Sequence, residues 1–426
     1  MKDYRLHTPE GVRDLLPREC ARKIEIERRI ESVFNRYGFY NVQTPTFEYY
    51  DVFSEDNGKI QQKHMYKFFD REGAILALRP DMTPPIARMA ATTLKEESKP
   101  IRLCYIGNAF RYNESYQGKT REFSQAGVEL LGMNSDEADA EVIALAINSL
   151  SAAGLNEFQI DLGQIEFFKG LLEEAGLNTE EEEEIRQLIE NKDFIGVEEY
   201  IEQFPIDSDL KQLFLDLPKL CGSIDIIEKT KSLTNNSRSR EALEKLKKVY
   251  EILCDYGVEK YVSFDLGMVN RSDYYTGIIF RGYTYGTGFS ILEGGRYDGL
   301  VGEFGKDCPA IGFGITIEQL MNAINRQKID IPVWKVDTLL VYEPKGRKQA
   351  LMTGDHLRSQ GGMYIENSLI NGDIEENKKY ALSKNIGGIL YFEDDQHVQL
   401  INLVNNQTIK TTVEELLQNA DRGETE

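Results

Sequence analysis

The spacing of apolar residues near the start of the chain predicts a helix followed by a strand. Within residues 19–37, apolar side chains recur at helical spacing and charged side chains lie between them, as on an amphipathic helix. The apolar positions are Ile24, Ile26, Ile30, Val33 and Phe34. Gly38 ends this pattern, and the alternation in residues 39–49 predicts a strand that is interrupted at Pro45.

The next stretch carries several strand signals and then a helix. Residues 67–83 predict a β-hairpin with a Glu-Gly turn, and residues 101–113 and 121–132 predict a strand pair around the polar loop ESYQGKT. Ser135 is suited to cap a helix, and helical periodicity follows it as far as residue 155. This region is therefore predicted to run strand, loop, strand, helix.

The composition becomes acidic and helical over residues 164–261, which predicts an inserted helical subdomain. We interpret the glutamate run in TEEEEEI as the solvated start of one of its helices. Strand signals return at 261–269 and 274–285. A glycine-rich turn is then predicted at 292–300, followed by a strand that passes into a helix over 310–324.

Strand and helix patterns alternate after a predicted linker around Pro332, which is typical of a small α/β domain. The predicted division is a core at 1–330, with the helical insertion at 164–261, and a second domain at 335–426. A chain of 426 residues with 41% hydrophobic residues can bury cores of this size.

Composition and charge indicate the cellular compartment and the classes of partner that we expect. The sequence has no run of about 18 apolar residues, and its start is polar, so we expect a cytoplasmic protein without membrane contact. The net charge of −21 disfavours nucleic acid as a partner, because a phosphate backbone is bound through Lys and Arg. Residues 335–426 carry ten Lys and Arg against fifteen Asp and Glu. A local basic patch elsewhere in the chain would still permit RNA binding.

The cysteines and histidines offer no metal site or redox motif. Cys20, Cys104, Cys221, Cys254 and Cys308 are far apart in the sequence and form no CxxC pair, so they are predicted to be small core residues. The four histidines are equally scattered. No metal and no cofactor is therefore expected.

Several motifs in a fixed order resemble the class II aminoacyl-tRNA synthetases, and most closely the histidyl-tRNA synthetase family. The motifs are PEGVRDLLPRE, RYGFYNVQTP, FRYNESYQGKTREFSQAGVE, SDYYTGIIF, EGGRYDGL and GFGITIEQL. The resemblance covers essentially the whole chain. It implies an α+β fold, in which an antiparallel sheet of the class II synthetase type is flanked by helices, with a helical insertion and a small C-terminal α/β domain resembling an anticodon-binding domain.

The same resemblance indicates that the groups for activating an amino acid with ATP are largely missing. Such chemistry needs guanidinium groups to hold phosphate and carboxylate oxygens. Arg111 of the second motif is kept, and the resemblance places it among the residues expected to bind histidine. Four positions where the family carries a charged group that handles ATP or the substrate hold other residues here, namely Asn113, Glu114, Asn270 and Gln319. We expect no catalytic residues for activation in this chain.

The residues that bind histidine in that family are largely retained. Asp81, Thr83 and Gln125 match positions near the ligand's amino group, and Glu129 matches the residue at the imidazole. Tyr274 and Tyr275 match the loop over the ring, and a carboxylate with a hydroxyl suits an imidazole's two nitrogens. The departures are Asn270 and Ser124, which stands where the family usually has histidine. These residues could alternatively be an inherited core without a ligand.

A retained histidine pocket beside lost activation groups resembles the regulatory subunits of ATP phosphoribosyltransferase. That family implies a non-catalytic chain that assembles with a short-form catalytic subunit and confers feedback inhibition by histidine. It also implies a homodimer within a hetero-oligomer, for which we predict contacts around Gly38 to Pro45. Two alternatives stay open, an active histidyl-tRNA synthetase and a stand-alone sensor of histidine or tRNA.

Overall fold

The computed structural model of the chain describes residues 4–53, 62–112, 120–269, 275–360, 362–370 and 373–421. The chain divides into two compact units, Met1–Ile331 and Pro332–Glu426, each described by itself below. Four residues singled out from the sequence lie outside the described residues, namely Asn113, Glu114, Asn270 and Tyr274.

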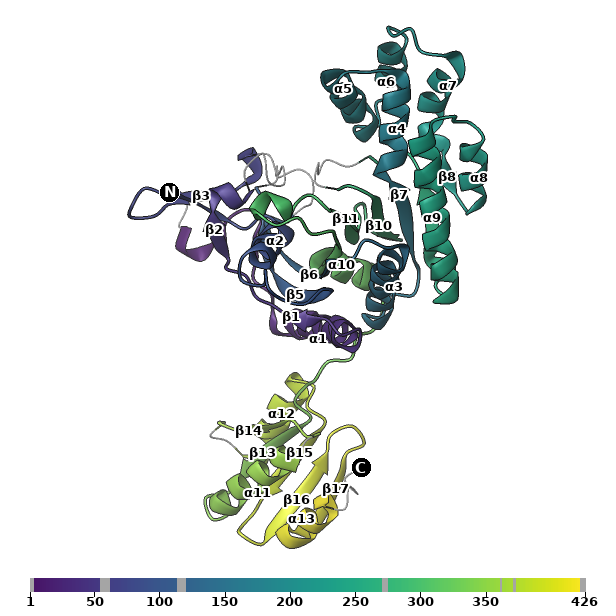
Figure 1. Ribbon diagram of the computed structural model, residues 1–426. Coiled ribbons are helices and arrows are strands. Elements are labelled where there is room, and N and C mark those ends of the chain that lie inside the picture. The colour runs from purple at the N-terminus through teal and green to yellow at the C-terminus, as the bar shows by residue number, and fades with distance from the viewer. Residues whose placement is uncertain are drawn as a thin grey trace. The chain divides into compact units, whose positions relative to one another are not determined.

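A nine-stranded sheet forms the centre of the first unit (Figure 1). Its order is β1 (Tyr40–Asn41), β5 (Ile101–Phe110), β6 (Glu122–Leu131), β12 (Ala310–Thr316), β11 (Leu292–Arg296), β10 (Ile278–Thr284), β7 (Phe158–Gln164), β9 (Val262–Asp265) and β8 (Cys221–Gly222). Neighbouring strands are antiparallel except for β1 with β5 and β7 with β9, which are parallel. The predicted antiparallel sheet is confirmed.

Helices cover one face of this sheet with the apolar stripe that the sequence predicts. Helix α1 (Pro17–Arg36) buries Ile26, Ile30, Val33 and Phe34 in the same core as α3 (Asp136–Ala152) and α10 (Ile317–Arg326). Ser135 caps α3 by accepting a hydrogen bond from the Ala138 N–H. The predicted helices at both places are confirmed.

The opposite face of the sheet packs against α2 (Thr83–Ala91). Because successive side chains of a strand point to opposite faces, Cys104 of β5 joins the core of α1 and α3, whereas Leu103 and Tyr105 join the core of α2. The same alternation places Leu131 of β6 on the α2 face. The odd-numbered residues of β6 therefore face the α2 side.

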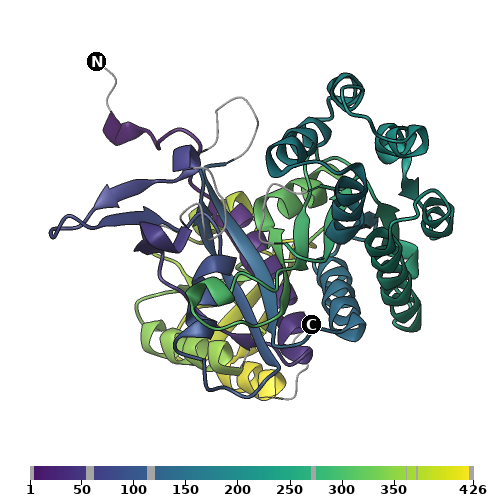
Figure 2. The same ribbon diagram turned by 45° about the horizontal axis from the view of Figure 1, so that its top comes forward.

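The stretch predicted as one strand interrupted at Pro45 becomes two strands in different sheets. Strand β1 belongs to the large sheet, and β2 (Phe47–Tyr49) pairs with β4 (Ile75–Leu78), which also pairs with β3 (Lys67–Phe69). The buried Arg79 guanidinium donates to the backbone carbonyls of Thr44 and Pro45 and so holds the chain between the two sheets. Figures 1 and 2 show the three-stranded sheet extending away from the large one.

The helical insertion lies between β7 and β9, and its short strand β8 pairs with β9 at the edge of the large sheet. Its helices are α4 (Ile165–Ala175), α5 (Thr179–Glu190), α6 (Phe194–Ile201), α7 (Ser208–Asp216), α8 (Asp225–Lys231) and α9 (Ser237–Asp255). The predicted solvated glutamate run opens α5, where Asn178 and Glu181 form a capping box. Because β7 and β9 are neighbours, the whole segment is inserted between two adjacent strands.

The second unit is a five-stranded mixed sheet with helices. The order is β14 (Ile365–Asn367), β13 (Thr338–Tyr342), β15 (Gly388–Phe392), β16 (His397–Asn402) and β17 (Gln407–Thr412), with helices α11 (Arg347–Gln360), α12 (Ile374–Ser383) and α13 (Val413–Asp421). The predicted alternation holds as far as β15. The antiparallel hairpin β16–β17 and α13 were not predicted, because β17 is mostly polar and exposed and carries no apolar pattern.

Two sequence-based predictions are wrong. The segment predicted as a glycine-rich turn begins with strand β11, where a Cβ at Gly294 would lie 2.4 Å from the Phe280 ring, so this glycine permits close packing within the sheet. Of the five cysteines, which are all free, Cys221 and Cys254 are exposed and not core residues.

Across the described ranges, no helix is long and apolar enough to span a membrane.

Candidate functional site

The carboxyl group of Glu129 is the centre of a buried polar cluster on the α2 face of the large sheet. Glu129 is 1% exposed. The Thr83 hydroxyl, at the start of α2, donates to its Oε1 over 2.9 Å, and the Tyr297 hydroxyl, just after β11, donates to its Oε2. Gly312 of β12 lies opposite Glu129, and a Cβ there would lie 1.8 Å from Oε2. Three separate segments therefore make room for this carboxyl and hold it.

Burial raises the pKa of Glu129 to about 8. The hydrogen bonds from Tyr297 and Thr83 act in the opposite direction, and the nearby Asp81 charge raises the pKa further. A pKa of about 8 favours the protonated form of the Glu129 carboxyl group at neutral pH. A ligand that donates an N–H to this carboxyl, or brings a positive charge, would favour its ionised form.

Asp81 and Arg111, two of the residues predicted for the site, contact each other directly. Arg111 Nη2 lies 3.1 Å from Asp81 Oδ2, and Arg111 Nε donates to the Pro80 carbonyl over 2.7 Å. Asp81 Oδ1 also accepts from the N–H groups of Met82 and Thr83. This carboxylate therefore fixes the first residues of α2, which in turn place the Thr83 hydroxyl at Glu129.

Two polar atoms of the cluster are buried and unsatisfied. Gln125 Oε1, on the same face of β6, and the hydroxyl oxygen of Tyr105, on β5, have no partner with hydrogen-bond geometry among the described residues. Buried polar atoms without a partner are costly and are normally satisfied by protein, water or ligand. The pair therefore marks the cluster as a place where a polar ligand would gain hydrogen bonds.

Tyr275 is brought to the edge of this cluster, and Tyr297 was missed. The half-buried Tyr275 ring packs on β11, where a Cβ at Gly295 would lie 2.7 Å from its Cδ1. Tyr297 is 2% exposed and contacts Glu129 directly, although the sequence argument assigned it no role. The signal for it was its place in EGGRYDGL, one of the motifs that carry the resemblance to the synthetases.

The structure describes Gln319 alone among the four altered activation positions. It is half-buried on α10, next to Glu318, whose Oε2 accepts the Ser124 N–H over 2.8 Å. Burial raises the pKa of Glu318. Ser124 is itself buried and donates its hydroxyl to Asn108 Oδ1 over 2.8 Å. This end of β6 therefore carries a neutral amide and a carboxyl group at the start of α10.

Comparison with known proteins decides the family. The sequence model of the histidyl-tRNA synthetase family matches residues 11–320. The chain is 52% identical, over 98% of its length and 100% of the relative, to an ATP phosphoribosyltransferase regulatory subunit of Acetivibrio thermocellus. It is 47% identical, over 98% of its length and 100% of the relative, to the protein of that name from Ruminiclostridium cellulolyticum. The chain belongs to the family of ATP phosphoribosyltransferase regulatory subunits.

Solved structures agree with this membership. A Bacillus halodurans protein described as an ATP phosphoribosyltransferase regulatory subunit/histidyl-tRNA synthetase superposes with a TM-score of 0.82 at 32% identity, over 92% of this chain and all of that one. Histidyl-tRNA synthetase from Nostoc also gives a TM-score of 0.82, at 22% identity over 98% of this chain and 99% of that one, which shows a shared fold. The predicted class II synthetase-like fold and the predicted family are confirmed.

The protein that carries the Glu129 cluster is thus a member of the regulatory-subunit family. From the predicted set, Asp81, Thr83, Arg111 and Glu129 are linked by hydrogen bonds. Gln125 lies four residues from Glu129 on the same face of β6, and Tyr275 packs on β11. Their role in binding histidine stays a prediction. Within the described ranges, no group of three or more His, Cys, Asp or Glu residues could hold a metal ion.

Proposed function

We propose that this chain is the cytoplasmic, non-catalytic regulatory subunit of ATP phosphoribosyltransferase, needed for the first step of histidine biosynthesis and for its feedback inhibition by histidine. The observation that carries the proposal is 52% identity to a named regulatory subunit over 98% of this chain. An alignment of 418 residues includes the C-terminal unit, so that unit does not set the chain apart from this relative.

The ligand in this proposal is histidine, bound at Glu129. The support is a buried carboxyl held by Thr83 and Tyr297, and a buried Gln125 Oε1 on the same face of β6 that lacks a donor among the described residues. An imidazole N–H would donate to the carboxylate, and the ligand's ammonium group is a donor for the amide oxygen. Asp81 and Arg111, already paired with each other, would position the ligand's charged ends.

Mixed with a short-form catalytic subunit, the chain is expected to form a hetero-oligomer whose phosphoribosyltransferase activity falls when histidine is added. Histidine inhibits if it binds the inactive assembly more tightly than the active one, and such coupling is usually about 5- to 150-fold. Glu129→Gln is expected to raise the histidine concentration needed for inhibition. The measurement is a histidine titration of the activity of the reconstituted complex.

Glu251→Gln is the matched control for this titration. It makes the same chemical change at an exposed position on α9, and its inhibition curve should overlay that of the wild type. If Glu129→Gln did not change the histidine concentration needed for inhibition, histidine would have to bind elsewhere in the complex. The Glu129 cluster would then be a buried polar cluster inherited from the synthetase fold, without a ligand.

We further propose a homodimer with contacts around Gly38 to Pro45. Strand β1 is the edge of the large sheet, and its Tyr40 is 76% exposed. Other exposed apolar side chains accompany it in the first 78 residues, namely Tyr4, Leu6, Leu16, Ile24, Phe47, Tyr49, Phe68, Phe69 and Ile75. Obligate dimers commonly bury more than about 2,000 Å², and these side chains offer an apolar surface for that purpose.

Light scattering at micromolar concentration is expected to give twice the 48.7 kDa chain mass, or a larger multiple. Tyr40→Glu should shift the protein toward the monomer, because a carboxylate would be buried in the contact. Tyr285→Glu is the control, since Tyr285 is 79% exposed just after β10, which is not a neighbour of β1 in the sheet. A monomeric wild type would contradict the proposal.

An active histidyl-tRNA synthetase is the second candidate, favoured by the match of that family's sequence model to residues 11–320. Gln319 in place of the third-motif arginine counts against it. A stand-alone sensor differs from both in having no phosphoribosyltransferase partner, so the reconstitution above separates it from the proposal.

A further inference from the structure

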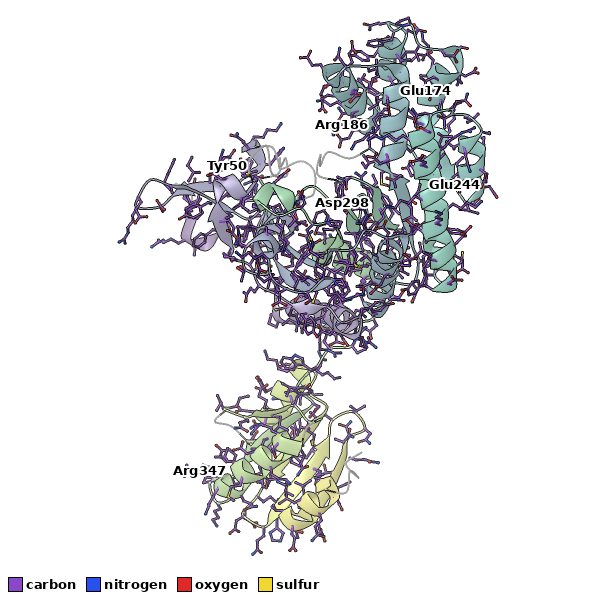
Figure 3. All side chains as sticks on the ribbon, in the orientation of Figure 1. Tyr50, Glu174, Arg186, Glu244, Asp298 and Arg347 are labelled. Carbon is purple, nitrogen blue, oxygen red and sulfur yellow. The ribbon has the colours of Figure 1, made fainter. Side chains whose placement is uncertain are left out.

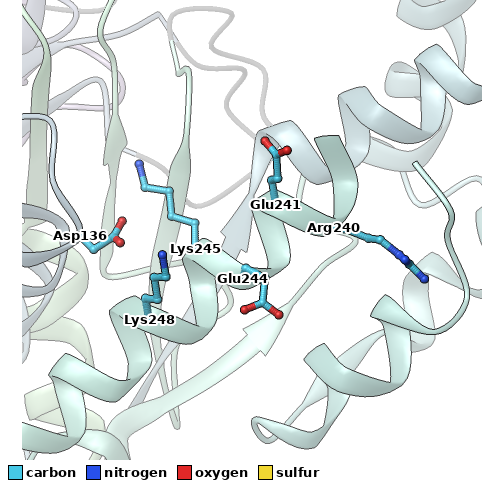
Figure 4. A pocket seen from close by; sticks show the side chains of 6 residues that line it. All are labelled: Asp136, Arg240, Glu241, Glu244, Lys245 and Lys248. Atoms are coloured by element: carbon cyan, nitrogen blue, oxygen red, sulfur yellow. The ribbon is translucent and has the colours of Figure 1, made fainter. Parts of the chain in front are cut away.

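An ion network joins the helical insertion to the Glu129 cluster. It begins at a surface cleft of about 400 Å³ between the start of α3 and the side of α9, lined by Asp136, Arg240, Glu241, Glu244, Lys245 and Lys248 (Figure 4). Both lysines project from α9 toward Asp136 in that view. Lys245 reaches further inward, and its Nζ lies 3.7 Å from Oδ2 of Asp139 on α3.

Asp139 forms a fully buried ion pair with Arg296 at the end of β11. Asp139 is 0% exposed and Arg296 is 1% exposed. Arg296 Nε donates to Asp139 Oδ1 over 2.9 Å, and Arg296 Nη2 donates to the same oxygen. The other oxygen, Oδ2, has no hydrogen-bond partner among the described residues, and the Lys245 ammonium lies within ion-pair distance of it.

Arg296 in turn holds both segments that carry the tyrosines of the cluster. Its carbonyl accepts the Thr276 N–H over 2.8 Å, and its Nη1 donates to Asp298 Oδ1 over 3.0 Å. Asp298, labelled in Figure 3, donates its N–H to the Thr276 hydroxyl over 2.9 Å. Thr276 follows Tyr275, and Arg296 immediately precedes Tyr297, so movement of Arg296 would displace both tyrosines.

We propose that Lys245 of the helical insertion is a positioning residue for the Glu129 pocket, acting through Asp139 and Arg296. The conformations of the insertion and the pocket are thereby coupled. A displacement of α9 alters the position of Tyr297, and ligand binding in the pocket alters the ion pair of Lys245 at the cleft. The part of this inference that concerns ligand affinity rests on the proposed binding of histidine at Glu129. The part that concerns the Tyr297 contact does not.

The physical reason is the cost of a buried carboxylate. Burial raises the pKa of Asp139, and the charges of Arg296 and Lys245 oppose that rise. Without Lys245, Asp139 keeps Arg296 but loses its second counter-charge, and Oδ2 still has no hydrogen bond, so protonation of Asp139 becomes easier and its hold on Arg296 weakens. The Tyr297 hydroxyl then contacts Glu129 less well.

Lys245→Met and Lys248→Met form a matched pair for the test. Both lysines lie on α9 and line the same cleft, but of the two it is Lys245 that forms the ion pair with Asp139. Both variants remove one charge from the surface and leave the buried ion pair in place. Asp139 and Arg296 are not substituted, because breaking a buried pair can unfold the unit.

Two measurements on the full-length chain are compared. The first is the histidine dissociation constant by calorimetry, which is expected to rise about 2- to 30-fold in Lys245→Met, the range for residues that act at a distance. The second is the titration midpoint of the Glu129 carboxyl in the free protein by ¹³C NMR, assigned with Glu129→Gln. It is expected to rise in Lys245→Met, because the Tyr297 hydrogen bond lowers it.

Lys248→Met should match the wild type in both measurements, and Lys245→Arg should restore both. The inference would be overturned if Lys245→Met and Lys248→Met gave the same dissociation constant and the same Glu129 midpoint. It would also be overturned if Lys245→Arg did not give the wild-type values. A raised Glu129 midpoint without histidine binding by the wild type would refute the proposed ligand and keep the positioning role. If the wild type bound histidine but Lys245→Met changed neither the Glu129 midpoint nor the affinity for histidine, the positioning role would be refuted and the proposed ligand would be kept.

Discussion

Purified chain is expected to show no histidine-dependent exchange of pyrophosphate into ATP and no charging of tRNA. Losing one preorganised donor typically lowers a rate by about 100- to 1000-fold, and four positions that the synthetase resemblance assigns to charged groups hold other residues. These are Asn113, Glu114, Asn270 and Gln319. The combined loss should put the rate below detection.

The measurement is an isotope-exchange assay with an authentic histidyl-tRNA synthetase run in parallel as the positive control. Gln319→Arg alone is expected to restore nothing, because the three other substitutions remain and Glu114 would still repel the triphosphate. Robust exchange by the wild-type chain at low protein concentration would show that the chain is an active histidyl-tRNA synthetase.

Glu129 is expected to make the stability of the chain fall as the pH rises from about 4.5 to about 8. Its pKa is raised from 4.5 to about 8 in the folded chain, so the folded state holds the proton more tightly than the unfolded state does. The stabilisation is therefore complete below pH 4.5 and is lost as the pH rises through 8. One pKa unit is worth about 1.4 kcal/mol, which sets an upper limit of about 5 kcal/mol.

Chemical denaturation between pH 5 and 9 measures this effect. Glu129→Gln, which cannot ionise, should show a flatter dependence of the free energy of unfolding on pH, with its largest advantage over the wild type at pH 9. Glu251→Gln, an exposed control, should keep the wild-type slope. Parallel curves for the wild type and Glu129→Gln would mean that Glu129 ionises normally in the fold.

Sequence patterns determined the elements whose signals are local. The apolar spacing of Ile26, Ile30 and Phe34 is a property of residues three to four apart, and it predicts both the helix and the face it buries. Ser135 marks the start of α3 for the same reason. The ordered motifs predicted the fold class and the family, because each motif is a short contiguous stretch.

The site depended on contacts between distant residues. Thr83 and Glu129 are 46 positions apart, and Glu129 and Tyr297 are 168 apart, so no local pattern could show that two hydroxyls meet on one carboxyl. The pairing register of β6 with β12 decides that Gly312, with no side chain, faces Glu129. The register also explains why the glycines at 294 and 295 lie in a strand and not in the predicted turn.

The buried network of Asp139, Arg296 and Lys245 is the clearest case of what the sequence alone left undecided. Asp139 and Arg296 are 157 positions apart, and in the sequence each is one of many charged residues, which are usually solvated. The fold buries both of them where α3 meets the end of β11. Sequence determined which residues could carry the chemistry, and the tertiary structure decided which of them lie within reach of one another, because burial and register are set by the whole sheet.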